Sequence, residues 1–143
     1  MSAQWITRWL ALAALWNVLG GVTALWNPMQ HFAQLYTSTL ALDDPMQLFF
    51  YRCTWINVIA WGLAYALAAA LSESRRAVLM AGAIGKSAYF AASVAIYHGG
   101  AGTKLLLAAG AVDLLLAAVF VVAFFSSAHG RPGELGRSFI TRT

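Results

Sequence analysis

The chain has 143 residues, of which 61% are hydrophobic and only 10% are charged, and its formal net charge is +4. A soluble domain carries about 25% charged residues, so this composition excludes an ordinary soluble domain and indicates an integral membrane protein. The basic residues stand at the ends of apolar runs instead of forming a soluble basic face, so nucleic acid is not an expected partner.

The first apolar run predicts a membrane-spanning helix over residues 9–26, with tryptophans near both ends, as is typical of the membrane interface. The next segment, 28–40, is too short and too polar to span a membrane. It begins with a helix-start pattern, because Asn27 can cap, Pro28 suits the first helical position and Gln30 stands at the capping-box position. We therefore predict a short interfacial helix across the outer end of the bundle.

Three further apolar runs, separated by short polar turns, predict spans over 46–71, 77–98 and 104–125. With the first span they form an all-α domain, an integral membrane four-helix antiparallel bundle over residues 1–127. Residues 128–143 are rich in glycine and arginine and lack periodicity, which predicts a flexible basic tail on the cytoplasmic side.

The basic residues are distributed unequally between the two sides of this bundle. One side has only Lys104, with Arg52 just inside the boundary, whereas the side of both termini has Arg8, Arg75, Arg76, Arg131, Arg137 and Arg142. The positive-inside rule then predicts a multi-pass protein of the inner membrane with both termini in the cytoplasm. Reporter fusions at Thr143 and near Asp43 test this topology, and an external C-terminus contradicts it.

Two opposite charges stand in the middle of the last two predicted spans. Lys86 lies ten residues after Arg76 and Asp113 nine residues after Lys104, which places each about 13 to 15 Å from a membrane edge at 1.5 Å per residue. A single charge at this depth costs about 2.5 to 3.5 kcal/mol on insertion scales and indicates a functional site by default. Because the two helices follow one another through a short turn, we predict that Lys86 and Asp113 form a pair inside the bundle.

Other polar residues fall at a similar depth or on the same helical face. Asn17 and Asn57 lie near the midplane of the first two spans, and Tyr89 and Ser93 share the helical face of Lys86. Two interpretations stay open. The charged pair is a structural tie that fixes helix register, or these residues line a small polar cavity for a ligand, a proton or an ion.

A second group of candidate residues lies on the predicted outer side. Arg52 is placed to reach the interface or to meet Asp43 or Asp44, and His31 stands in the short helix. The single cysteine, Cys53, excludes an intrachain disulfide and a CxxC redox motif. No catalytic constellation, phosphate loop or metal-ligand set is recognisable, so neither a metal site nor a catalytic residue is assigned.

Two glycine-containing motifs mark the last two spans, with the spacing Gly82-x-x-Gly85-Lys86-x-x-x-Phe90 and then Gly110-x-x-Asp113, with Phe120 and Phe124 beyond. This spacing resembles the last two helices of small bacterial four-helix membrane proteins of the DoxX-like kind, mainly over the second half of the chain. The resemblance implies a four-helix bundle of the cytoplasmic membrane, a type that in some cases serves as a partner subunit in membrane-associated redox or quinone-linked assemblies. The chain lacks a cysteine or histidine pair to bind a redox centre itself, so the resemblance supports the architecture more than an activity. No cofactor is evident from the residues, and a lipid or a quinone is the ligand left open.

Three functions follow from these observations. The first is an accessory or ligand-binding subunit, lipid- or quinone-linked, in contact with the bilayer and with a larger membrane complex or a second copy; a stoichiometric partner on copurification indicates it. The alternative is a small dimeric proton-linked transporter that uses Lys86 and Asp113, which pH-dependent flux in liposomes tests. A second alternative is a membrane enzyme on a lipid-like substrate, with Lys86, Asp113 or Tyr89 in acid–base roles. A ligand bound between the helices discriminates best among the three.

Overall fold

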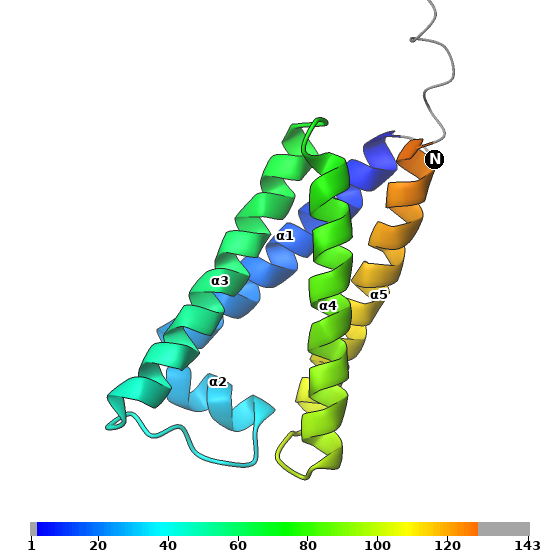
Figure 1. The fold of residues 1–143 in the computed structure, drawn as a ribbon. Coiled ribbons are helices and arrows are strands. Elements are labelled where there is room, and N and C mark those ends of the chain that lie inside the picture. The colour runs from blue at the N-terminus through cyan, green and yellow to red at the C-terminus, as the bar shows by residue number, and fades with distance from the viewer. Residues whose placement is uncertain (1–2, 129–143) are drawn as a thin grey trace, which may run out of the picture.

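The computed structural model describes residues 3–128, which form five α-helices (Figure 1). In chain order they are α1 (Ala3–Trp26), α2 (Pro28–Leu35), α3 (Pro45–Ala70), α4 (Arg75–His98) and α5 (Lys104–Ala128). The all-α class, the four long helices and the short helix between the first two of them are confirmed.

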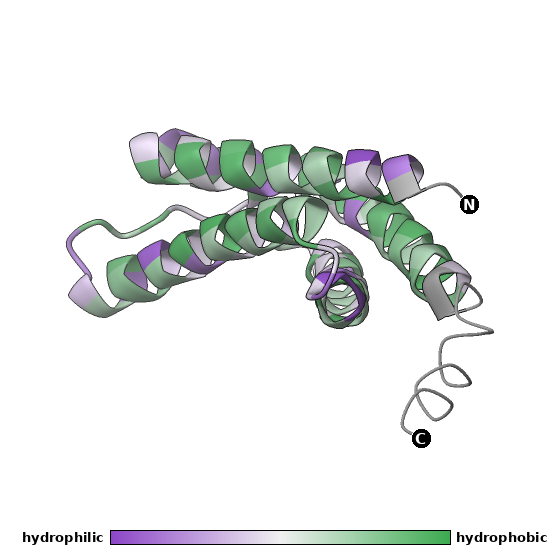
Figure 2. Cartoon of the chain, turned by 90° about the horizontal axis from the view of Figure 1, so that it is seen from above, coloured by the Kyte–Doolittle hydropathy of each residue, from purple (hydrophilic) through white to green (hydrophobic). Residues whose placement is uncertain are grey.

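The four long helices are long and apolar enough to cross a membrane, over Gln4–Trp26, Pro45–Ala70, Arg75–His98 and Lys104–Ser126. Most of their residues are hydrophobic (Figure 2), and many large apolar side chains, among them Leu15, Ile84 and Leu115, are exposed. An exposed apolar surface of this extent is suited to lipid and not to water. Helix length and composition therefore support a multi-pass membrane protein.

Local capping determines where the middle helices begin. The side chain of Asn27 accepts a hydrogen bond from the backbone N–H of Gln30 at 3.2 Å, as predicted, and Pro28 follows it. The carboxylate of Asp44 accepts bonds from the N–H groups of Met46 and Gln47 and starts α3 in the same way. In both places the cap satisfies backbone donors that a helix leaves unpaired in its first turn.

Two boundaries differ most from the prediction, and the others differ by at most three residues. The expectation that the short helix runs to Leu40 is wrong, because α2 ends at Leu35 and Tyr36 takes an extended conformation. Tyr36 pairs there with Gly102 in an isolated β-bridge, a tertiary contact that replaces the next helical turn. At the N-terminal side α1 begins at Ala3 instead of residue 9, since no glycine or proline interrupts residues 3–8. Residues 129–143 of the predicted tail lie outside the described residues.

The long helices are arranged as two pairs. α1 packs mainly along α3 and α4 mainly along α5, while contacts between the two pairs are sparse. The pairs meet at the terminal end, where α1 begins and α5 ends, and separate toward the α2 end (Figure 1). An apolar core joins all four long helices at the terminal end; it consists of Ile6, Leu10, Ala13, Ala14, Tyr65, Ala68, Leu79, Ala83, Leu116, Ala117, Phe120 and Ala123.

The α2 end is closed by hydrogen bonds between α2 and the loop that joins α4 to α5. The backbone N–H of Thr103 donates to the carbonyl of Leu35 at 2.9 Å, and that of Thr37 donates to the carbonyl of Ala101 at 3.0 Å. The hydroxyl of Thr103 donates to the carbonyl of Gln34 at 2.6 Å. These bonds hold α2 across the space between the two helix pairs.

Candidate functional site

A cavity of about 560 Å³ lies between the two helix pairs and is lined by residues from all five helices. Its walls are mainly apolar and aromatic, with Trp16, Phe32, Tyr36, Tyr51, Trp55, Trp61, Tyr65 and Tyr89 among the lining residues. The apolar core bounds it toward the terminal end, and α2 bounds it at the other end. Its size and lining are typical of small-molecule sites.

A polar cluster of Lys86, Asp113 and Asn17 lies on the wall of this cavity. The ammonium Nζ of Lys86 is 2.5 Å from Oδ1 of Asp113 and 3.0 Å from Oδ1 of Asn17. The side chains of Lys86 and Asp113 are only 5% and 13% exposed, so each charge depends on the other for stabilisation. The predicted contact between Lys86 and Asp113 is therefore confirmed, and Asn17 joins it from α1.

The polar cluster connects the two helix pairs. Lys86 and Asp113 belong to the α4–α5 pair, whereas Asn17 belongs to α1 and donates its amide to the backbone carbonyl of Val58 in α3 at 3.3 Å. A continuous chain of hydrogen bonds thus runs from α3 through α1 and α4 to α5. The two helix pairs make few other contacts beside the cavity. These hydrogen bonds therefore fix the position of one pair relative to the other near the middle of the long helices.

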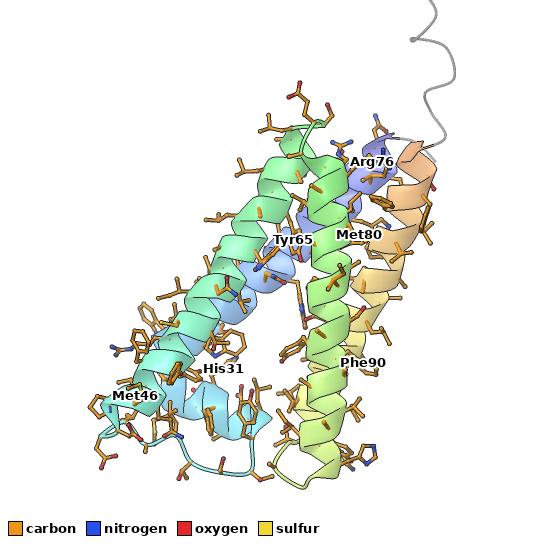
Figure 3. All side chains as sticks on the ribbon, viewed as in Figure 1. His31, Met46, Tyr65, Arg76, Met80 and Phe90 are labelled. Atoms are coloured by element: carbon orange, nitrogen blue, oxygen red, sulfur yellow. The ribbon has the colours of Figure 1, made fainter. Side chains whose placement is uncertain are left out.

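Tyr65 is a site residue that the sequence did not indicate. It is 2% exposed, and it lies between α3 and α4 (Figure 3), with its ring centroid 5.6 Å from the Lys86 ammonium. A cation at that distance from an aromatic ring is attracted to it. Gly82 makes room for the ring, since a Cβ there meets Cε1 and the hydroxyl of Tyr65 at 2.8 Å. In the sequence Tyr65 stands in an apolar run, without a signal that distinguishes it from a packing residue.

The other predicted midplane residues divide into two groups. Asn57 and Tyr89 line the cavity. Asn57 is exposed, and within the described residues 3–128 its side chain forms no hydrogen bond to the polar cluster. Ser93 instead is buried against Gly110 at the α4–α5 contact and donates its hydroxyl to the carbonyl of Tyr89 at 2.8 Å. Ser93 therefore packs the helix pair together.

The predicted outer residues have separate places. Arg52, Asp43 and Asp44 are exposed, and Asp44 is occupied as the cap of α3. Within the described part of the chain, Lys86 and Asp113 form the one salt bridge, so Arg52 is not paired with either aspartate. Of the two alternatives for Arg52, the ion pair is therefore absent, because the Asp44 carboxylate is directed to the backbone of α3, and a position of Arg52 at the interface stays a prediction.

His31 lies at the α2 end of the cavity (Figure 3). Its Nδ1 is 3.1 Å from the hydroxyl of Tyr51. The same hydroxyl donates its proton to the carbonyl of Ala24 at 3.3 Å. A tyrosine hydroxyl has one proton, so both bonds form when Nδ1–H of His31 donates to Tyr51. The ring also packs edge-on against Trp55, with 4.5 Å between centroids. Burial lowers the pKa of His31, which favours the neutral form of the ring.

We expect the stability of the protein to fall as the pH drops below about 6.5. The pKa of His31 is lowered in the folded state, so the unfolded state binds more protons between the two pKa values, and stability rises with pH across that window. Thermal unfolding in detergent between pH 5 and 8 measures this. His31→Gln is expected to flatten the dependence, His98→Gln is the matched control, and an unchanged dependence in His31→Gln contradicts the assignment.

The cavity opens sideways between α3 and α4. Asn57 of α3 and Ala81 and Gly85 of α4 line it and are at the same time exposed. A Cβ built on Gly85 meets nothing within 4 Å, so this part of α4 leaves free space beside the cavity. In a bilayer, an opening between two spanning helices faces the hydrocarbon.

Comparison with protein-family models, with curated proteins and with solved structures finds no match to this chain. The resemblance to DoxX-like proteins therefore stays a prediction from the sequence. Within residues 3–128, no three histidine, cysteine, aspartate or glutamate side chains lie close enough together to hold a metal ion. The arrangement offers a charged hydrogen-bond donor, a carboxylate, an amide and aromatic rings around one cavity.

Proposed function

We propose that this chain is a ligand-binding or accessory subunit of the inner membrane, which holds a lipid-like molecule, such as a quinone or another lipid, in the cavity between its helix pairs. The observation that carries the proposal is the cavity itself, about 560 Å³ in volume and open between α3 and α4. A molecule already dissolved in the bilayer reaches this opening without crossing water.

The composition of the wall supports the same proposal. Aromatic and aliphatic side chains suit the apolar part of a ligand, while the polar cluster and Tyr65 offer it a few directed polar contacts. The exposed apolar exterior of the four long helices provides the contact with lipid. A larger membrane complex or a second copy of the chain are the partners that fit an accessory role.

The test fills the opening without disturbing the fold. Gly85→Leu places a side chain where Gly85 has free space, so we expect a folded protein with a blocked cavity. Native mass spectrometry of the purified full chain then measures whether bound lipid-like molecules are retained.

Two variants serve as controls for this test. Gly85→Ala adds only a methyl group at the same position, and Ala91→Leu adds the same leucine on α4 at an exposed residue that does not line the cavity. We expect the unaltered chain and both controls to retain the ligand and Gly85→Leu to lose it. Equal retention in all four proteins contradicts binding in this cavity.

A second proposal is proton-linked transport, favoured by the position of the Lys86–Asp113 ion pair on the cavity wall. Ionisable residues inside membrane spans mark proton relays in pumps and transporters. Liposomes that contain the protein are expected to show pH-dependent flux if this proposal is correct. Flux that is unchanged when both residues are neutralised counts against it.

A further inference from the structure

We infer that the cavity selects an electrically neutral amphiphile whose head carries a hydrogen-bond acceptor, such as a carbonyl, and that this acceptor binds the Lys86 ammonium. The inference rests on the proposed ligand-binding function and narrows its ligand class. It excludes anionic and cationic lipids as the preferred occupants.

The first step is the number of donors on Lys86. An ammonium group has three N–H donors. Two of them have acceptors in the structure, Oδ1 of Asp113 at 2.5 Å and Oδ1 of Asn17 at 3.0 Å. Among residues 3–128, no third acceptor is bonded to this nitrogen, and Lys86 lines the cavity. One charged donor is thus left for a molecule that occupies the cavity.

The second step is the net charge of the cavity wall at this point. Lys86 and Asp113 cancel at a separation of 2.5 Å, so the pair presents no net charge to a ligand. An anion that approaches Lys86 also approaches the carboxylate of Asp113, and the repulsion offsets most of the attraction. A cation that approaches the carboxylate of Asp113 also approaches the ammonium of Lys86, and the repulsion again offsets most of the attraction. Either ion also loses its hydration on entering an apolar cavity, without a counter-charge to compensate for it.

A neutral acceptor avoids both penalties. It gives up only the solvation of a polar group, and it gains a hydrogen bond from a charged donor, the strongest kind that the cavity offers. The ring of Tyr65, whose centroid is 5.6 Å from the same nitrogen, covers one side of the ammonium and limits the directions from which an acceptor can approach. The apolar remainder of the ligand then lies along the aromatic wall or leaves through the opening beside Gly85.

The test compares four probes of equal chain length that differ only in the head: a methyl ketone, an alkyl sulfate, an alkyl trimethylammonium and an alkane. Their binding to the full chain is measured by native mass spectrometry titration in detergent. Binding of the same probes to Gly85→Leu, in which the cavity is blocked, measures how much probe binds elsewhere on the protein. We expect the ketone to bind about tenfold more tightly than each other probe, since one charged hydrogen bond corresponds to roughly that factor.

The double variant Lys86→Met/Asp113→Leu removes the donor without leaving an unpaired charge, and in it the ketone should bind no better than the alkane. Three results overturn the inference and leave the binding function intact: a charged probe that binds as tightly as the ketone, a ketone that binds no better than the alkane, or a ketone preference that survives in the double variant. If no probe binds the unaltered chain more tightly than Gly85→Leu, the proposed function fails and the inference with it.

Discussion

Replacement of Lys86 by methionine is expected to destabilise the protein by about 3 to 5 kcal/mol, because it leaves the carboxylate of Asp113 without its partner in an apolar surrounding. Asp113→Leu is expected to have a similar effect, since the ammonium of Lys86 is only 5% exposed and then retains Asn17 alone. Chemical unfolding in detergent, followed by circular dichroism, measures both free energies of unfolding.

The double variant decides whether the two residues act as a pair. With both charges removed no uncompensated charge is left, so Lys86→Met/Asp113→Leu is expected to recover much of the loss. Lys104→Met serves as the control, because it makes the same chemical change at an exposed residue at the start of α5. If the double variant loses as much free energy of unfolding as the two single variants together, the two residues do not stabilise one another.

The same double variant discriminates the structural role of the pair from a functional one. A stable double variant that binds the ketone probe as tightly as the unaltered chain indicates a tie that only fixes the helices. A stable double variant in which ketone binding falls to the level of the alkane indicates that the ammonium contacts the ligand. The double variant thus tests the structural role of the pair and its role in ligand binding in one protein. It avoids the loss of stability that is expected for each single variant.

Gly82→Ala is expected to destabilise the protein by about 1 to 3 kcal/mol, the usual range for overpacking. The added methyl lies 2.8 Å from Cε1 and Oη of Tyr65 and 3.0 Å from Cε2 of Phe120. Both rings are buried, at 2% and 0% exposure, so neither can move aside without disturbing the apolar core. The displacement of Tyr65 is also expected to alter the surroundings of the Lys86 ammonium.

Gly85→Ala is the matched control for this prediction. It makes the same substitution one turn along α4, where the new methyl meets nothing within 4 Å. Alanine is favoured over glycine inside a helix by roughly 0.5 to 1 kcal/mol, so Gly85→Ala is expected to be neutral or slightly stabilising. Thermal unfolding of the two variants side by side measures the difference. Equal effects at both positions indicate that Gly82 is not a contact for Tyr65.

The fold was predictable because the membrane imposes strong and local rules. Spans are recognisable by apolar length, helix starts by caps such as Asn27, and the central pair by two charges, Lys86 and Asp113, in otherwise apolar runs. The order of the helices then brings these charges together, since α4 and α5 are consecutive and antiparallel. Each of these signals is visible within one segment of the sequence.

The cavity was not predictable in the same way. Its existence depends on how far the α1–α3 pair separates from the α4–α5 pair, and hydropathy contains no information about that separation. Tyr65 belongs to the site only because Gly82, on another helix, leaves space for its ring. The end of α2 at Leu35 depends on the bridge between Tyr36 and Gly102, two residues that are far apart in the sequence. Contacts between distant segments determine all three features.

The Lys86–Asp113 bond lies inside one helical hairpin, α4 and α5, joined by a loop of only five residues, Gly99 to Thr103. Neither charge therefore has to enter the bilayer alone. In a translocation assay, α4 by itself is expected to insert poorly, since a central lysine costs about 2.5 to 3.5 kcal/mol. The hairpin is expected to insert more readily than its two helices tested apart, and equal efficiency contradicts this. We therefore expect α4 and α5 to enter the membrane together during synthesis, with the lysine and the aspartate already neutralised by one another.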